Sequence, residues 1–434
     1  MNNTRTQHSQ EVMISRTQAL AVVRRNLKWF TQSGVMRPQD GFWGVAERLA
    51  ITEGNPAAEK MLSSFPCYSR LGEGVVAMEH RRADCCVQTA WLFDLAADAL
   101  KRPALRAVAD NILAYLTQRS GLRQRDSRCD TFGLWGWSNP VNSTNHWTDD
   151  NSWVVMLLLK LAENGRPDLK PLAIQTARAM HRHVGAYLER LKSIGFDNPG
   201  KPTEGIPMNG LLLNPHWLGL SCMALSNAAA ADPDFECRDV IDAYFPMSLK
   251  GPPASQRLHL PLGGLKRPWP LSEYAYLGLA ASVVALQMPG CSAEEAALSA
   301  GRELIERQFP DGHFPSEHGE SPTAHHLADM IYTENWAVLA LLHLHAWSGD
   351  TVYSDAARRS LEFLARIQDA TPDRRFKGCW RGMFDTQSGA WGGGDRFEGG
   401  ANSIYSGWTN APISLAFLFN SGTGSLFADH SSLI

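Results

Sequence analysis

Helical segments of two kinds alternate along the whole chain, and this alternation restricts its fold more than any other feature. Segments of the first kind are amphipathic, so that one side can face water while the other packs. They span residues 16–32, 103–119, 169–192, 235–248, 293–308 and 353–368. Segments of the second kind are apolar nearly all round and must be covered on more than one side. They span residues 83–99, 150–163, 216–230, 272–288, 332–347 and 404–419.

The strict order of these twelve segments, amphipathic first and apolar last, predicts six helical hairpins closed into a ring. Convincing period-two strands are nearly absent, so the predicted fold is all-α, an (α/α)6 toroid with an inner and an outer layer. No linker rich in proline, serine or charge divides the chain. We therefore predict one domain over residues 15–420, with tails at 1–14 and 421–434.

The connections are of two lengths, and the difference predicts where function lies. Those leading from an apolar to an amphipathic segment are short, whereas those entering each apolar segment are long. The long ones span residues 33–79, 120–145, 193–213, 249–270, 309–329 and 369–401. In a closed ring they gather on one face, around the positive ends of the inner helices. We call this face the mouth and expect ligands there.

Composition and charge exclude several classes of partner and cofactor. The chain has 41 basic and 44 acidic residues and lacks a basic run, which argues against nucleic acid. It also lacks a stretch of the ~20 apolar residues that a membrane span needs and the residue order of a secretory signal, so we predict a cytoplasmic protein without a membrane partner. Its eight cysteines include no C-x-x-C, and the histidine-rich stretch 313–326 lacks a recognised ligand spacing. We predict no metal and no cofactor.

Two adjacent aspartates, Asp149 and Asp150, open the apolar segment in "HWTDDNSWVV". One of them could serve only as a helix cap. Two neighbouring carboxylates near an apolar core repel each other, and this raises the pKa of one, leaving a proton donor beside an ionised partner. Adjacent residues seldom aim at one atom, so we expect either aspartate to pair with Glu334, which opens another apolar segment. Glu334 could alternatively have only a structural role, as an acid in the first turn of a helix. Glu273 and Glu398 are weaker candidates for the catalytic partner.

Further candidates for binding lie at the segment starts and in the long connections. The basic group could bind a carboxylate, although a solvated charge run is the alternative; it comprises His80, Arg81 and Arg82. At the segment starts stand His146, Trp147, His216, Trp217, Tyr332, Tyr405 and Trp408. Glycine-rich loops carry four tryptophans that we predict as sugar platforms, with ordinary loop packing as the alternative. They are Trp43, Trp135, Trp137 and Trp391.

The hairpin order and the stretch "WTDDNSWVVMLLLKLA" resemble the six-hairpin glycosidase superfamily. The stretch is similar to the paired-aspartate helix of bacterial endo-α-mannanases, where the two acids act as nucleophile and acid/base. It is also similar to the helix of unsaturated glucuronyl hydrolases, where one aspartate protonates a vinyl ether and activates water. Only Asp149, Asp150 and Trp153 match. The later mannanase motifs are missing, so the resemblance does not imply mannan as substrate.

The resemblance and the paired acids together predict a glycoside hydrolase that acts on an oligosaccharide or glycoside. The basic "HRRAD" cluster would suit an (unsaturated) uronic acid as part of that substrate. Three alternatives stay open. A polysaccharide lyase on the same ring would use Tyr332, Tyr405, His146 or His216, and an epimerase of the N-acylglucosamine type would use paired histidines. The third alternative is a toroid that binds carbohydrate without catalysis. Neither the sugar nor the oligomeric state follows from the sequence.

Overall fold

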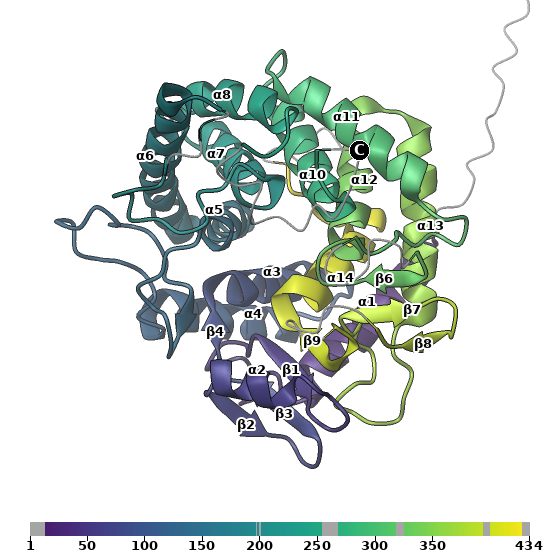
Figure 1. Ribbon diagram of the computed structural model, residues 1–434. Coiled ribbons are helices and arrows are strands. Elements are labelled where there is room, and N and C mark those ends of the chain that lie inside the picture. The colour runs from purple at the N-terminus through teal and green to yellow at the C-terminus, as the bar shows by residue number, and fades with distance from the viewer. Residues whose placement is uncertain are drawn as a thin grey trace, which may run out of the picture.

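The computed structural model describes residues 14–196, 198, 201–253, 268–317, 325–393 and 400–427, and within them the helices form two concentric layers (Figure 1). The outer layer comprises α1 (Arg16–Gln32), α4 (Ala104–Ala114), α6 (Lys170–Ile194), α8 (Arg238–Ser248), α11 (Ala293–Arg307) and α13 (Thr351–Ile367). The inner layer comprises α3 (Ala83–Ala99), α5 (Thr148–Glu163), α7 (Leu220–Ala231), α10 (Leu271–Gln287), α12 (Glu334–Ser348) and α14 (Ala411–Asn420). All twelve predicted segments are present in the predicted order.

The inner helices form a closed ring. Each packs against the next, from α3 through α5, α7, α10 and α12 to α14, and α14 packs back on α3. The first outer helix, α1, covers the seam because it contacts both α14 and α3. The predicted (α/α)6 toroid is therefore confirmed. None of the described helices combines the length and apolar character of a bilayer span.

Three of the predicted helical segments contain a π-helical turn. One follows α4 at Tyr115–Arg119, one precedes α7 at Pro215–Gly219, and one precedes α14 at Ser406–Asn410. A π-helical turn is wider than an α-helical turn, so it changes the direction in which its side chains point, and such turns are common at functional sites. At the mouth, the first side chains of two inner helices therefore point in directions that a regular α-helix would not give them. Short 3-10 turns occur at Pro167–Leu169 and Gly400–Asn402.

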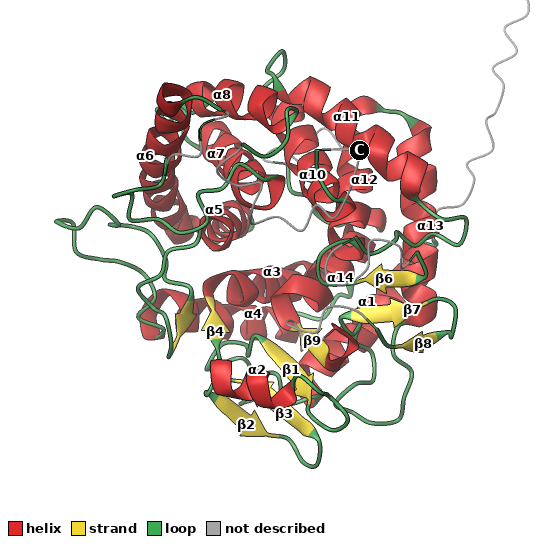
Figure 2. Cartoon of the chain, viewed as in Figure 1, coloured by secondary structure: helices red, strands yellow, loops and turns green. Residues whose placement is uncertain are grey.

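Short strands in the long connections are a feature that the sequence pattern did not predict (Figure 2). A four-stranded antiparallel sheet has the order β2-β3-β1-β9, from Tyr68–Arg70, Val75–Met78, Arg48–Ile51 and Ser403–Tyr405. The helix α2 (Ala58–Ser64) belongs to the same connection. Smaller pairings join β4 (Arg81–Arg82) to β5 (Ser138–Asn139), and β7 (Met383–Asp385) to β6 (Leu327–Asp329) and β8 (Ala390–Trp391). These strands have two to four residues each, too few to show alternation.

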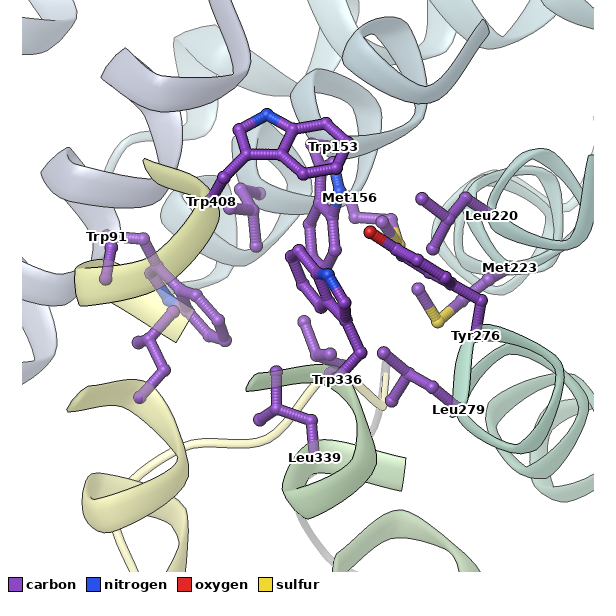
Figure 3. Packing of buried hydrophobic residues seen from close by; sticks show 14 of the residues in the cluster. Trp91, Trp153, Met156, Leu220, Met223, Tyr276, Leu279, Trp336, Leu339 and Trp408 are labelled. Atoms are coloured by element: carbon purple, nitrogen blue, oxygen red, sulfur yellow. The ribbon is translucent and has the colours of Figure 1, made fainter. Parts of the chain in front are cut away.

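Aromatic side chains fill the bore of the ring below the mouth (Figure 3). Trp153 of α5 stacks on Trp336 of α12 with ring centroids 5.3 Å apart, and Tyr276 of α10 lies 5.0 Å from Trp336. Trp408 meets Trp336 edge-on at 5.9 Å. Large rings from four inner helices therefore form a solid floor, and a ligand that enters from the mouth stops above it.

The C-terminal segment is part of the core, in contrast to the predicted tail at 421–434. Leu426 and Phe427 are each 1% exposed. The backbone N–H of Leu426 donates to Nε2 of His343 at 3.1 Å, and Lys160 donates to the carbonyl oxygen of Phe427. Burial lowers the pKa of His343 to about 4, so its ring is the neutral acceptor that this bond requires. Two apolar residues in a short polar context gave no periodic signal, which is why the prediction failed for 421–427.

We expect Leu426→Ala to lower the free energy of unfolding by about 2–5 kcal/mol, because it leaves a cavity at a fully packed site. The matched control is Leu298→Ala in α11, where the side chain is 50% exposed. We expect the control to change stability by less than about 0.5 kcal/mol. Urea unfolding followed by fluorescence measures both values. Equal stability of the two variants would show that the C-terminal segment is not docked in solution.

Candidate active site

Arg82 stands at the centre of a cluster of carboxylates at the mouth. It is the last residue before α3 and is 8% exposed. Its Nε and Nη2 atoms donate to both oxygens of Asp84 at 3.1 and 3.0 Å, and Nη2 also donates to Asp150 Oδ1 at 3.0 Å. Its Nη1 atom donates to Glu47 Oε1 at 3.3 Å. One buried guanidinium thus joins acids from two inner helices and from the first long connection.

Asp149 and Asp150 point to different neighbours although they are adjacent in sequence. Successive residues of an α-helix are rotated by about 100° around its axis, so neighbouring side chains diverge. Asp150 turns toward α3 and its Arg82 contact, whereas Oδ2 of Asp149 lies 3.3 Å from Nε2 of His216, in the turn before α7. Both aspartates are at most 2% exposed. The two acids therefore occupy distinct chemical environments.

The surroundings of Asp150 favour its protonated form. Burial raises its pKa well above the usual range, and the neighbouring carboxylates of Asp84 and Asp149 raise it further, in opposition to Arg82. For Glu47 the balance is reversed, because Arg48, Arg82 and His80 together outweigh burial and lower its pKa. A carboxyl group that keeps its proton near neutral pH can act as a general acid.

His216 is held from both sides. Its ring stacks between Trp217 at 4.5 Å and Tyr276 at 4.8 Å, and its backbone N–H donates to Glu273 Oε2 at 2.7 Å. The other oxygen of Glu273 accepts from Asn214 at 2.8 Å. Burial raises the pKa of Glu273. Glu273 therefore fixes the π-helical turn that presents His216 to Asp149.

Several buried polar atoms of the site, at Asp149 and at the Glu47–Arg82 pair, have no hydrogen-bond partner among the described residues. They are Oδ1 of Asp149, the hydroxyl oxygen of Tyr276 and Nε2 of His80. A buried polar group without a partner costs free energy, and such groups in one place are typical of a site that hydrogen-bonds a polar ligand. Acceptors and donors in this mixture match sugar hydroxyl groups.

Most of the sequence-predicted residues do lie around this cluster. Trp408 donates from Nε1 to Asp84 Oδ2 at 2.5 Å, and the guanidinium of Arg82 lies 5.2 Å from the Trp408 ring and 5.5 Å from that of Trp137. Trp147 stacks on Trp217 at 5.2 Å. With these residues belong Asp149, Asp150, Arg82, His80 and His216.

Glu334 does not pair with either aspartate in the described structure. Its Oε1 atom accepts from the backbone N–H of Phe314 at 2.6 Å, and burial raises its pKa well above the usual range. It is fully buried, and among the described residues it forms no hydrogen bond or ion pair with Arg82 or His216. The partner of Asp150 is instead Asp84, which shares Arg82 with it. Glu398, the other acid considered, lies outside the described residues.

Four aromatic or histidine candidates are inaccessible or pack elsewhere, and a fifth, Tyr332, is half-buried. Trp135 is fully buried and donates from Nε1 to Thr176, so it cannot serve as a platform. Trp391 packs on Phe384 at a ring distance of 5.1 Å, and Phe384 in turn lies 6.1 Å from Phe363 of α13. His146 is buried, and its backbone N–H donates to Asn209. The backbone N–H of Tyr332 donates to Asp329. The ring of Tyr405 is buried and lies under the guanidinium of Arg48.

Two candidates near the entrance keep part of their predicted character. Trp43 is 51% exposed and packs edge-on against Phe42, itself 40% exposed, so it remains available as a platform. Arg81 is engaged, because it forms an ion pair with Glu79 at 2.5 Å and donates to the carbonyl oxygen of Trp43.

Sequence reasoning missed Asp84 and Glu47 as members of the cluster. Asp84 lies in the first turn of α3, just as Asp150 lies in the first turn of α5, so the rule that selected Asp150 also applies to it. Glu47 had no such signal, because it lies in a connection. Among the described residues, no group of three or more His, Cys, Asp or Glu side chains is arranged to hold a metal ion.

Comparison with known proteins identifies the fold. No protein-family model and no curated protein sequence matches the chain. Among solved structures, D-mannose isomerase superposes with a TM-score of 0.60 at 12% identity, over 94% of this chain and 97% of that one. Unsaturated glucuronyl hydrolase from Bacillus sp. GL1 gives 0.55 at 15%, over 93% and 94%. Cellobiose 2-epimerase from Spirochaeta thermophila DSM 6192 gives 0.54 at 14%, over 94% and 96%. The chain shares their (α/α)6 toroid, as the six-hairpin resemblance predicted.

Proposed function

We propose that the protein is a glycoside hydrolase that cleaves an oligosaccharide or glycoside by carboxylate acid/base catalysis. The observation that carries this proposal is the divergence of the two aspartates at the start of α5. Asp150 lies among acids that raise its pKa, and Asp149 is oriented by His216 with one oxygen that has no hydrogen-bond partner among the described residues. One protonated and one available carboxylate are the two groups that glycoside hydrolysis requires. Enzymes of the same fold that act on sugars support a carbohydrate substrate.

The reaction follows from these two positions. Asp150 donates its proton to the glycosidic oxygen as the bond to the anomeric carbon breaks. Asp149 either takes a proton from the attacking water or attacks the anomeric carbon itself, and the two routes give products of inverted or retained configuration. Proton NMR of the first-formed anomer distinguishes them. The stacked rings of Trp217 and His216 provide an apolar face beside Asp149 for a sugar ring.

The described charges favour a neutral sugar at the catalytic position. Arg82 already binds three carboxylates, and Arg81 is paired with Glu79, so that only Nη1 of Arg81 lacks a partner among the described residues. Apart from Asp150 and Glu273, whose pKa values are raised, the cluster contains the acids Glu47, Asp84 and Asp149 against the cations Arg48 and Arg82. An added carboxylate would meet like charge. The basic cluster therefore gives less support to an (unsaturated) uronic acid at this position than its sequence suggested.

Product analysis tests the proposal. Purified protein is incubated with a panel of neutral aryl glycosides and oligosaccharides, with uronic-acid oligosaccharides in parallel. New reducing ends on a neutral substrate support the proposal. A new ultraviolet-absorbing unsaturated end would instead identify a lyase, and the loss of such an end would identify an unsaturated glucuronyl hydrolase.

A sugar isomerase or epimerase is the second candidate, and the pairing of His216 with Asp149 favours it. A histidine oriented by a carboxylate can remove a proton from carbon next to a carbonyl group. Incubation of free hexoses in D2O tests this candidate. Incorporation of solvent deuterium without new reducing ends would favour the isomerase over the hydrolase.

The proposal predicts a specific pH dependence. Activity requires protonated Asp150, so it is present below the pKa of this group and is lost as the pH rises through it. The carboxylate of Asp84 raises that pKa. We therefore expect Asp84→Asn to move the basic limb of the kcat/KM profile to lower pH. An unmoved basic limb in a variant that retains activity would show that Asp150 is not the titrating acid.

A further inference from the structure

A cleft at the outer rim of the ring is lined by four arginines. It has a volume of about 660 Å³ and lies between the end of α1, the β2–β3 turn and the connection after α13. Its charged lining residues are Arg37, Arg70, Arg374 and Arg375, and none of its described lining residues is acidic. Outer helices end on the face where inner helices begin, so the cleft opens on the same face as the mouth.

Three of these guanidinium groups lack ion-pair partners in the described part of the chain. Arg37, Arg70 and Arg374 are exposed and form no ion pair there. Arg375 donates to both oxygens of Asp373, at 3.1 Å to Oδ1 and at 2.9 and 2.6 Å to Oδ2, and Arg374 also acts on that carboxylate by lowering its pKa. Asp373 thus interacts with two of the four arginines, and the four stand together although the net charge of the chain is -3. Clustered like charges destabilise a surface unless an anion is bound between them.

The walls of the cleft are fixed by hydrogen bonds and close packing. Nη1 of Arg375 donates to the carbonyl oxygens of Leu71 and Glu73 at 3.3 and 3.0 Å, which joins the two connections that form the cleft. Trp29 of α1 donates to the carbonyl oxygen of Arg375 at 2.8 Å. Gly34 has φ +94° and lies so close to Leu71 that a Cβ atom would be 2.9 Å from its side chain. The arginines are therefore presented by a preformed site.

We propose that this cleft binds a phosphate or sulfate group. Guanidinium groups recognise such oxyanions through paired N–H donors, and several of them together provide both charge and geometry. A water molecule occupies about 30 Å³ in the liquid, so the cleft has room for an ester-linked sugar in addition to the oxyanion. The ligand is therefore either the free ion or a phosphorylated or sulfated sugar.

The four-stranded sheet connects the cleft to the catalytic cluster over a short distance. Arg70 pairs with Val76, while Met78, two residues further along β3, pairs with Arg48. Two residues of a strand span about 7 Å. Arg48 in turn lies 3.8 Å from Glu47 of the cluster. A charged substituent of a longer sugar chain could thus occupy the cleft while a neutral unit lies at Asp149, but the inference does not depend on the proposed function.

Direct binding measurements test the inference without any assay of activity. The wild-type protein is titrated by calorimetry with inorganic phosphate, inorganic sulfate, glucose 6-phosphate and unmodified glucose, at constant ionic strength set with sodium chloride. The double variant Arg37→Gln/Arg374→Gln removes two of the unpaired cations. The matched control is Arg24→Gln, which removes an exposed arginine of α1 that does not line the cleft.

We expect saturable binding of the oxyanions and at least a tenfold loss of affinity in the double variant, with the control variant unchanged. Tighter binding of glucose 6-phosphate than of inorganic phosphate would identify a sugar ester as the ligand class, and equal binding would identify the free ion. The inference is overturned by non-saturable binding, by unchanged affinity in the double variant, or by an equal loss in the control.

Discussion

Replacement of Asp150 by asparagine is expected to lower kcat/KM by about 10²- to 10⁴-fold, the range that a positioned general acid contributes. Asparagine has the shape of the protonated carboxyl group but has no proton to give to the leaving oxygen. Its side-chain oxygen can still accept the bond from Arg82 that Asp150 accepts at 3.0 Å. We therefore expect the melting temperature to change by only a few degrees. Steady-state kinetics on the substrate found by product analysis, together with calorimetry, measure both quantities.

Glu334→Gln is the matched control for this experiment. Glu334 is also a buried acid with a raised pKa in the first turn of an inner helix, but it binds the backbone of Phe314 and not the cluster. We expect this variant to retain most of the activity. If Asp150→Asn retained near-full activity, or if it lost stability and activity in parallel, Asp150 would be a helix-capping residue and not the acid. A large loss of activity in Glu334→Gln alone would show that the catalytic acid lies on α12.

Replacement of Arg82 by methionine is expected to destabilise the protein by about 3–5 kcal/mol, because it leaves buried carboxylates without their cation. Methionine preserves much of the side-chain length and removes the charge. The free energy of unfolding is measured by urea titration. The control is Arg128→Met, whose side chain is 88% exposed in a pair with Asp126, and we expect no measurable change there.

The pH dependence of the Arg82 variant identifies the cause of its destabilisation. Arg82 helps to lower the pKa of Glu47 in the wild type, so in the variant acid pH protonates Glu47 and removes its uncompensated charge, and the stability difference from wild type should shrink as the pH falls. A pH-independent difference would show that the loss comes from packing and not from electrostatics.

The helices of this fold could be predicted because each layer imposes its own pattern. An inner helix is covered on all sides, so α3 is apolar throughout and its predicted bounds, 83–99, agree with the structure. An outer helix has one side in water, so α1 carries a charged stripe and was placed equally well at 16–32. Short strands and the docked segment at 421–427 escaped prediction, because two to four residues are too few to show a period.

The candidate site was predictable only where it depends on helix starts. The first-turn rule selected Asp149 and Asp150 and applies equally to Asp84, but it gives no information on which starts face each other across the ring. For this reason Glu334 was chosen as the partner, whereas the structure brings Asp84 to Asp150 through Arg82. Glu47 comes to the same place through β-sheet pairing, a long-range contact without a local sequence signal.

The pairing of β1 with β9 and the packing of α14 on α3 have a consequence for synthesis of the protein. The acidic side chains of the cluster, from Glu47 to Glu273, emerge from the ribosome within the first two-thirds of the chain, whereas Trp408, which binds Asp84, emerges almost last. Contacts this distant in sequence form late and slowly. A nascent chain that still lacks its final hairpin therefore holds the reactive groups apart, and premature termination near the end of translation should yield an inert product.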